Sequence, residues 1–142
     1  MEIILVTGNE EKLRVAKLAL QGKNIKLVKR KIETPEIQSE DSKEIAEYSS
    51  KHAAELLKKP VLKTDVSWKI KALNGFPGPF SKYVNKWFSP EDYLKLLDEK
   101  KDRFVEVIEY LSYCEPGKKP ISFYGIAKGT IEKMKANSIP RI

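Results

Sequence analysis

This 142-residue sequence lacks several features that are common in secreted and membrane proteins. It holds one cysteine, Cys114, so no internal disulfide can form, and a single thiol in a buried strand is typical of a reducing compartment. No apolar run approaches the roughly 20 residues that a bilayer span needs. The first residues show none of the basic, apolar and small-residue regions of a signal peptide. These absences predict a cytoplasmic protein that is not inserted in a membrane.

The charge pattern also lacks the order expected of a nucleic-acid binder. The net charge is +7, from 27 Lys and Arg against 20 Asp and Glu. Such an excess attracts nucleotides or nucleic acids, and it is also found in Lys- and Glu-rich thermophile proteins. The basic residues are scattered, without the aromatic–basic repeats of single-strand binding platforms. Nucleic-acid binding is therefore the weakest of the functions that the sequence leaves open.

Apolar runs alternate with segments of helical spacing, and this predicts a single α/β domain over residues 1–142. We expect a long, mixed, twisted sheet flanked by helices, with a substrate cleft beside its central strands. The predicted strands cover 3–6, 24–29, 61–64, 67–73, 103–114 and 121–134. The predicted helices cover 10–21, 42–58, 80–88 and 90–100. Residues 135–142 show no periodic pattern.

Two of these helices carry side chains whose surroundings the pattern also predicts. The helix at 42–58 has one face made of Ile45, Tyr48, His52 and Leu56. His52 is the only histidine, and without a second histidine or cysteine nearby it is not expected to bind metal. In the aromatic segment 80–88, core packing is the favoured role for Tyr83 and Trp87.

The segment from Pro60 to Tyr83 carries the strongest chemical pattern. Asp65 follows an apolar run, and aspartate is a poor strand former, so we expect it at a strand end with a functional role. The loop from Asn74 to Pro79 contains two glycines and two prolines, which make it stiff and allow close approach to a ligand. A carboxylate facing such a loop can hold a metal and a polyphosphate.

A second pattern follows the first strand, where Thr7, Gly8 and Asn9 lead into a helix. Asn9 is a good N-cap, and the free amides of a helix start can bind phosphate with help from Lys12. Many strand–helix turns share this pattern, so it does not identify phosphate binding alone. Glu36 lies in a polar segment after Pro35, where an ordinary exposed glutamate is the simpler interpretation.

Taken together, these patterns resemble the inosine-triphosphate pyrophosphatase family. The matching motifs, which run through nearly the whole chain, are Thr7-Gly8-Asn9-x-x-Lys12, Pro35-Glu36-Ile37-Gln38, Asp65, and Ala72-Leu73-x-Gly75-x-Pro77-Gly78-Pro79-Phe80-Ser81-Lys82-Tyr83. The resemblance implies a Mg²⁺-dependent enzyme that hydrolyses noncanonical purine nucleoside triphosphates, such as ITP, XTP or dITP, to the monophosphate and pyrophosphate. It also implies a homodimer.

The resemblance further assigns roles to individual residues. It implies that Glu36 and Asp65 hold the metal and that Asp65 activates the attacking water. It implies that the phosphates are bound by Thr7, Gly8, Asn9 and Lys12, with Lys82 as a further substrate lysine. Mg²⁺ suits this set, because it binds a few carboxylates together with phosphate oxygens and water.

The sequence also departs from the family pattern. Thr64 stands where the family has a second acidic residue, and Val66 and Ser67 replace a Ser-Gly pair, which is expected to weaken metal binding. Ser49 stands where many members have a lysine. The family's usual C-terminal base-recognition segment has no counterpart in residues 1–142, so weak activity or relaxed specificity is expected. The alternative is a degenerate, non-catalytic member that binds nucleotide or a protein partner.

Overall fold

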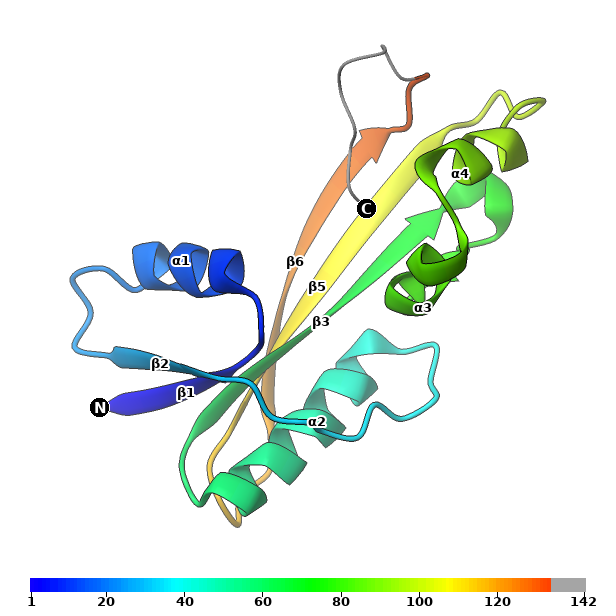
Figure 1. Cartoon of the computed structure of the whole chain (residues 1–142). Helices are drawn as coiled ribbons and strands as arrows, with labels where there is room; N and C mark the ends of the chain where they lie inside the picture. Colours follow the sequence, from blue (N-terminus) through cyan, green and yellow to red (C-terminus); the bar gives the residue numbers. More distant parts are fainter. Residues whose placement is uncertain (134–142) are drawn as a thin grey trace. The chain divides into compact units, whose positions relative to one another are not determined.

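The computed structural model describes residues 1–133, so residues 135–142 and the end of the last predicted strand at Met134 lie outside the described residues. Its strands are β1 (Glu2–Val6), β2 (Lys26–Arg30), β3 (Val61–Ile70), β4 (Pro77–Gly78), β5 (Phe104–Cys114) and β6 (Ile121–Thr130). Its helices are α1 (Glu10–Ala19), α2 (Ser42–Leu57), α3 (Ser81–Trp87) and α4 (Pro90–Leu96), with a 3₁₀ turn, η1, at Lys71–Leu73 (Figure 1).

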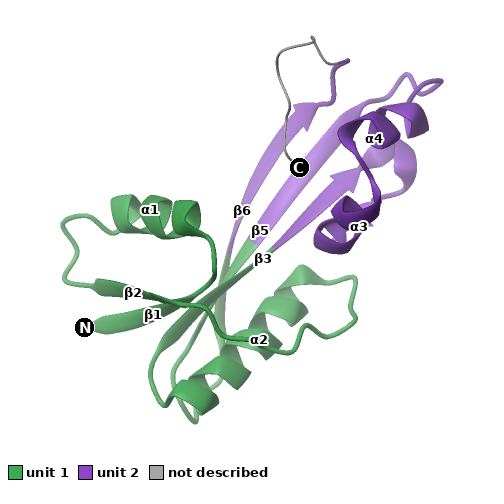
Figure 2. Ribbon diagram, viewed as in Figure 1, with its two compact units in different colours: residues 1–65, 110–123 green, residues 66–109, 124–142 purple. Residues whose placement is uncertain are grey.

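The strands form one mixed six-stranded sheet in the order β2-β1-β3-β5-β6, with β4 paired to β3. β1 is parallel to both β2 and β3, whereas β4 is antiparallel to β3. The predicted α/β fold with a mixed sheet and flanking helices is thus confirmed. The chain divides into two compact units, residues 1–65 with 110–123 and residues 66–109 with 124–142 (Figure 2).

In the first unit, the apolar run of β1 is buried on both of its faces. Ile3 and Leu5 pack in a cluster that includes Leu13 and Ala16 of α1. The alternate residues Ile4 and Val6 pack in a second cluster with small residues of α2. Because successive strand residues point to opposite faces, α1 and α2 cover opposite sides of the sheet in this unit. Cys114 belongs to the α2 cluster and is 1% exposed, as predicted.

In the second unit, α3 and α4 pack on a core centred on Ile70 and Leu97, both fully buried. Phe76, Phe88 and Tyr93 add a group of rings whose centroids lie 5.4–6.2 Å apart, a separation at which aromatic pairs attract. The sequence prediction for α3 was wrong in one respect, since Tyr83 is 42% exposed and Trp87 is 73% exposed. Val84 and Ser81 are the buried residues of this helix instead.

A second prediction that the structure corrects is the strand end at Asp65. β3 is one continuous strand of ten residues, and Asp65 lies in its middle. The predicted second strand, 67–73, is the far half of β3 followed by η1. The glycine–proline loop returns to this half, because Pro77 and Gly78 pair with Lys69 and Trp68. β3 thus continues through an aspartate that strand propensity alone disfavours.

Candidate active site

The turn between β1 and α1 is held by its own polar side chains. Thr7 Oγ1 accepts a hydrogen bond from the Asn9 amide at 3.1 Å. Asn9 Oδ1 accepts bonds from the amides of Glu11 at 2.9 Å and Lys12 at 3.3 Å, which confirms Asn9 as the N-cap of α1. Two of the first helical amides are thereby satisfied internally, and the turn has one fixed conformation.

The surroundings of this turn are suited to an anion. Lys31 lies against Gly8, since a Cβ atom built on Gly8 would be only 3.2 Å from Lys31 Cδ. The parallel register explains this approach, because Val6 lies opposite Arg30 and the residues after these two strand ends leave the sheet at the same level. The sequence motifs do not include Lys31. Only the pairing of β1 with β2 shows that it lies beside the turn. Lys31 therefore adds positive charge beside the turn.

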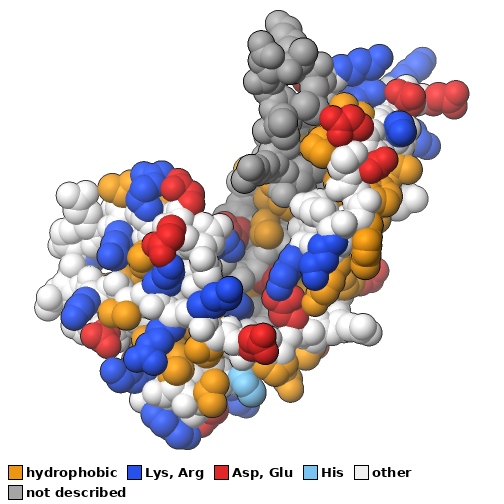
Figure 3. All heavy atoms as spheres, in the orientation of Figure 1, with side chains coloured by type: hydrophobic (Ala, Val, Ile, Leu, Met, Phe, Trp, Pro, Cys, Tyr) orange, Lys and Arg blue, Asp and Glu red, His pale blue; other side chains and the backbone are white. Residues whose placement is uncertain are grey.

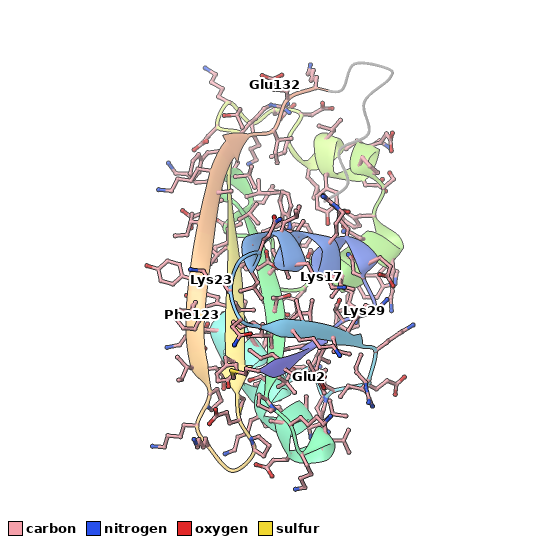
Figure 4. All side chains as sticks on the ribbon, turned by 90° about the vertical axis from the view of Figure 1, so that its left-hand side faces the viewer. Glu2, Lys17, Lys23, Lys29, Phe123 and Glu132 are labelled. Atoms are coloured by element: carbon pink, nitrogen blue, oxygen red, sulfur yellow. The ribbon has the colours of Figure 1, made fainter. Side chains whose placement is uncertain are left out.

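Two glutamates at the start of α1 would repel a phosphate if they were not paired. Glu10 forms an ion pair with Lys29, a residue of β2 that is labelled in Figure 4. Glu11 forms one with Arg14 at 2.5 Å, and the hydrogen bond from Arg14 holds the pKa of Glu11 below its ordinary value. Each acid thus has a cation at contact distance, which reduces the repulsion of an incoming triphosphate.

Lys12 links this turn to β3. Its Nζ donates a hydrogen bond to Thr64 Oγ1 at 2.9 Å, and both side chains are partly buried. The parallel register of β1 and β3 pairs Ile4 with Val61 and Leu5 with Leu62, shortly before Thr64. Thr64, where the resemblance implies an acid, accepts this bond from Lys12. The ammonium of Lys12 is held beside the middle of β3, next to the turn.

Asp65 points to the opposite face of β3 from Thr64. Leu62 packs in the cluster with α1, and Val61 packs in the cluster with α2. Strand alternation then directs Thr64 toward the α1 side and Asp65 toward the α2 side. Asp65 is partly buried there.

Glu36 lies in the loop between β2 and α2, and α2 anchors this loop. Ser49 Oγ, on a fully buried residue of α2, donates a hydrogen bond to the carbonyl of Pro35 at 2.9 Å. Glu36 itself is exposed. The loop that carries Glu36 is therefore fixed to the same helix that covers the Asp65 face. Ser49, which stands where the resemblance implies a lysine in many members, helps to anchor the Glu36 loop through this bond.

The donor set has the chemistry of a magnesium site completed by substrate. Within residues 1–133, no group of three or more His, Cys, Asp or Glu side chains is placed to hold a metal ion. Glu36 and Asp65 are hard oxygen donors from two separate elements, and Mg²⁺ commonly binds to one or two carboxylates with substrate phosphates and water. The residues present fit Mg²⁺ in this shared mode.

Comparison with known proteins places the chain in a family. The sequence model of the Ham1 family matches residues 3–138. The chain belongs to the Ham1 family. A relative from Methanopyrus kandleri, named dITP/XTP pyrophosphatase, is 40% identical over 131 residues, which are 92% of this chain and 70% of the relative. A relative from Aspergillus fumigatus, named inosine triphosphate pyrophosphatase, is 33% identical over 92% of this chain and 70% of its own length.

Solved structures of Ham1 proteins have the same fold. The Coxiella burnetii HAM1 protein matches with a TM-score of 0.80 and 26% identity, over 98% of this chain and 78% of its own. The Staphylococcus aureus Ham1 protein matches with a TM-score of 0.78 and 25% identity, over 93% of this chain and 72% of its own. The resemblance that the motifs indicated is therefore confirmed.

The predicted site residues of this Ham1 chain fall in both units. Six of them lie in the first unit: Thr7, Gly8, Asn9, Lys12, Glu36 and Asp65. Lys82 belongs to the second unit, on the exposed side of α3, with its Nζ 6.0 Å from the centre of the Tyr83 ring. Its predicted role toward substrate stays a prediction.

Proposed function

We propose that this chain hydrolyses noncanonical purine nucleoside triphosphates, of the dITP, XTP and ITP type, to the nucleoside monophosphate and pyrophosphate. Its membership of the Ham1 family, with relatives named for this activity, carries the proposal. The internally capped turn between β1 and α1, with Lys12 and Lys31 beside it, supports binding of a triphosphate. The positive dipole end of the helix and the two lysines attract anions, although Asn9 already accepts the amides of Glu11 and Lys12.

Each residue of the site has a distinct part in the proposed reaction. The turn from Thr7 to Asn9 and the ammonium of Lys12 bind and orient the phosphates. Glu36 and Asp65 would hold Mg²⁺, which when bound offsets the charge of the triphosphate and acidifies water. Asp65 accepts the proton of the attacking water as the bond between the α-phosphorus and the bridging oxygen breaks. The leaving group is pyrophosphate.

The departures from the family pattern affect the strength of metal binding more than the mechanism of hydrolysis. With Thr64 in place of an acid, one carboxylate is absent beside the metal position, so we propose that a higher Mg²⁺ concentration is needed. Thr64 instead orients Lys12 through a neutral hydroxyl. Val66 supplies no polar atom where the family has serine.

Assembly and location are narrower parts of the proposal. The family resemblance supports a homodimer, which sedimentation at several protein concentrations would test. No described helix of residues 1–133 combines the length and hydropathy of a membrane span. A single buried, reduced thiol supports a cytoplasmic location.

Pyrophosphate release from dITP, XTP and ITP, with dATP and dGTP as reference nucleotides, tests the function. We expect Mg²⁺-dependent release that favours the first three. Asp65→Asn should lower turnover by about 100-fold or more, as the loss of a general base predicts. Asp98→Asn, which neutralises an exposed acid after α4, is the matched control and should leave turnover unchanged. Nucleotide binding without any pyrophosphate release would instead identify a degenerate, non-catalytic member.

A further inference from the structure

Lys31 occupies a fixed place beside the turn between β1 and α1. The carbonyl of Arg30, the residue before it, accepts a hydrogen bond from the Thr7 amide at 3.0 Å. Ile32, the residue after it, packs against the buried cluster of β1 and α2. The backbone of Lys31 is therefore held on both sides, although it lies just outside the sheet.

The side chain of Lys31 is positioned by Gly8. A Cβ atom built on Gly8 would lie 3.2 Å from Cδ, 3.4 Å from Cε and 3.5 Å from Cγ of Lys31, so the bare glycine leaves room for the aliphatic stem. Backbone conformation does not require this glycine, because Gly8 is not among the glycines with positive φ. The stem thus lies along the turn. The ammonium, one bond beyond Cε, is close to the same turn.

The ammonium of Lys31 differs from its neighbours because no acid of residues 1–133 forms an ion pair with it. Lys29 is paired with Glu10, and Arg14 is paired with Glu11. Basic side chains with acids among them cover α1 and β2 in this way (Figure 3). Lys31 is also exposed to solvent. Its positive charge is therefore available to an anion that binds at the turn.

Lys12 and Lys31 approach the turn from opposite sides. The sheet order β2-β1-β3 places β1 between the other two strands. Lys31 follows β2, whereas the ammonium of Lys12 is hydrogen-bonded to Thr64 of β3 at 2.9 Å. Adjacent strands lie about 4.8 Å apart, so β2 and β3 are separated by about 10 Å. Cations from these two strands match a chain of phosphates better than a single phosphate.

We propose that Lys31 binds the terminal phosphate of the substrate and thereby favours triphosphates over diphosphates. The inference rests on the proposed function, in which the bond is cleaved on the β3 side, where Asp65 lies. Lys31, on the β2 side, is then beside the far end of the phosphate chain. The terminal phosphate carries the highest negative charge of the chain and gains most from an ammonium, whereas the uncharged nucleoside gains nothing. Lys12 contacts the phosphates nearer the cleaved bond, which triphosphates and diphosphates share.

Isothermal titration calorimetry of the full chain with α,β-methylene analogues of dITP and dIDP, in the presence of Mg²⁺, measures both affinities without turnover. We expect Lys31→Gln to raise the Kd of the triphosphate analogue by about fivefold to tenfold, as the loss of one exposed charge-assisted hydrogen bond predicts. The Kd of the diphosphate analogue should change by less than about twofold. Lys23→Gln removes the same charge from an exposed residue at the opposite end of β2 and should leave both affinities almost unchanged (Figure 4).

Gly8→Ala tests whether the glycine positions Lys31. The added methyl group would displace the lysine stem, so the Kd of the triphosphate analogue should rise. In a Lys31→Ala background the stem is absent, and Gly8→Ala should then have almost no further effect. An equal effect in both backgrounds would contradict the positioning by Gly8.

Two results would overturn the assignment of Lys31. The first is an unchanged affinity of Lys31→Gln for the triphosphate analogue. The second is an equal rise in Kd for both analogues, or a rise that Lys23→Gln matches, which would indicate only general attraction to a basic protein. In either case, pyrophosphate release from dITP by the natural chain would leave the proposed hydrolysis standing. No such release, together with no binding of either analogue, would refute both proposals.

Discussion

Replacing Thr64 by valine tests whether this residue positions Lys12 for phosphate binding. Valine has nearly the shape of threonine but cannot accept the 2.9 Å hydrogen bond from Lys12 Nζ. Hydrogen bonds to charged groups contribute about 1.5–3 kcal/mol, and the lower end applies because both side chains are partly exposed. Without the bond to Thr64 the ammonium of Lys12 is positioned less firmly for the substrate, so about 1–1.5 kcal/mol of binding free energy is lost.

This loss corresponds to a rise in KM of about fivefold to tenfold. In the proposed reaction Lys12 contacts phosphate before and during the chemical step, so we expect kcat to change little, which is the pattern for uniform binding. Steady-state pyrophosphate release from dITP at saturating Mg²⁺ measures both constants. Thr64→Ser keeps the hydroxyl and should behave nearly as the natural chain does.

A double-mutant cycle gives the sharper comparison. If Thr64 acts through Lys12, the double variant Lys12→Met/Thr64→Val should have a KM no higher than that of Lys12→Met alone. Full additivity of the two effects, or an unchanged KM in Thr64→Val, would refute the positioning role.

Three further predictions concern stability and reactivity. Leu97 is fully buried, so Leu97→Ala should lower the free energy of urea unfolding by about 2–5 kcal/mol. Its neighbour Leu96 is 41% exposed, and Leu96→Ala should lower it by about 0.5 kcal/mol or less. Equal losses in the two variants would contradict the assigned core. Hydrogen bonds from the amide and hydroxyl of Ser89 hold the pKa of Asp92 below its ordinary value, so the stabilising effect of this carboxylate is present at neutral pH and lost as the pH falls below about 4. The difference in unfolding free energy between the natural chain and Asp92→Asn should therefore shrink at pH 3. A difference that grows at pH 3 would contradict the lowered pKa. Burial raises the pKa of Cys114, with the charge of Glu55 as a smaller cause, so Ellman's reagent at pH 8 should react only on unfolding, and rapid reaction of the native protein would contradict its burial.

Local sequence patterns predicted the elements that depend on local chemistry. The run from Ile3 to Val6 gave a buried strand, because only a strand covered on both faces is apolar at every position. Asn9 was predicted as the N-cap, since its side chain reaches amides two and three residues ahead. The turn residues and Asp65, which the family motifs single out, lie in one unit.

Features that depend on distant packing were not predictable in this way. Asp65 lies inside a strand that pairs with β1 near its start and with β4 near its end, and no local pattern shows these partners. On α2, Tyr48 and Leu56 were expected on the apolar face but are 50% and 59% exposed. Small residues face the sheet instead, and Ser50 forms a buried hydrogen bond with Ser112 at 2.7 Å. Close helix–sheet approach thus favoured small side chains over large apolar ones.

Helix α3 shows the same limitation. Aromatic residues at helical spacing usually mark a core-facing side, and that rule predicted burial of Tyr83 and Trp87. The buried positions of this short helix are Ser81 and Val84. The loop before α3 is tied to β3 by the pairing of Pro77 and Gly78 with Lys69 and Trp68, a contact that helical spacing alone does not reveal.

The central claim is that Glu36 and Asp65 hold one divalent ion between them beside a phosphate-binding turn. Anomalous X-ray diffraction from crystals grown with Mn²⁺ and a non-hydrolysable dITP analogue tests it directly. We predict a single manganese peak within about 2–2.5 Å of a carboxylate oxygen from each residue, with the analogue's phosphates against Thr7 to Asn9. A manganese ion bound to neither carboxylate, or to only one of them, would contradict the account.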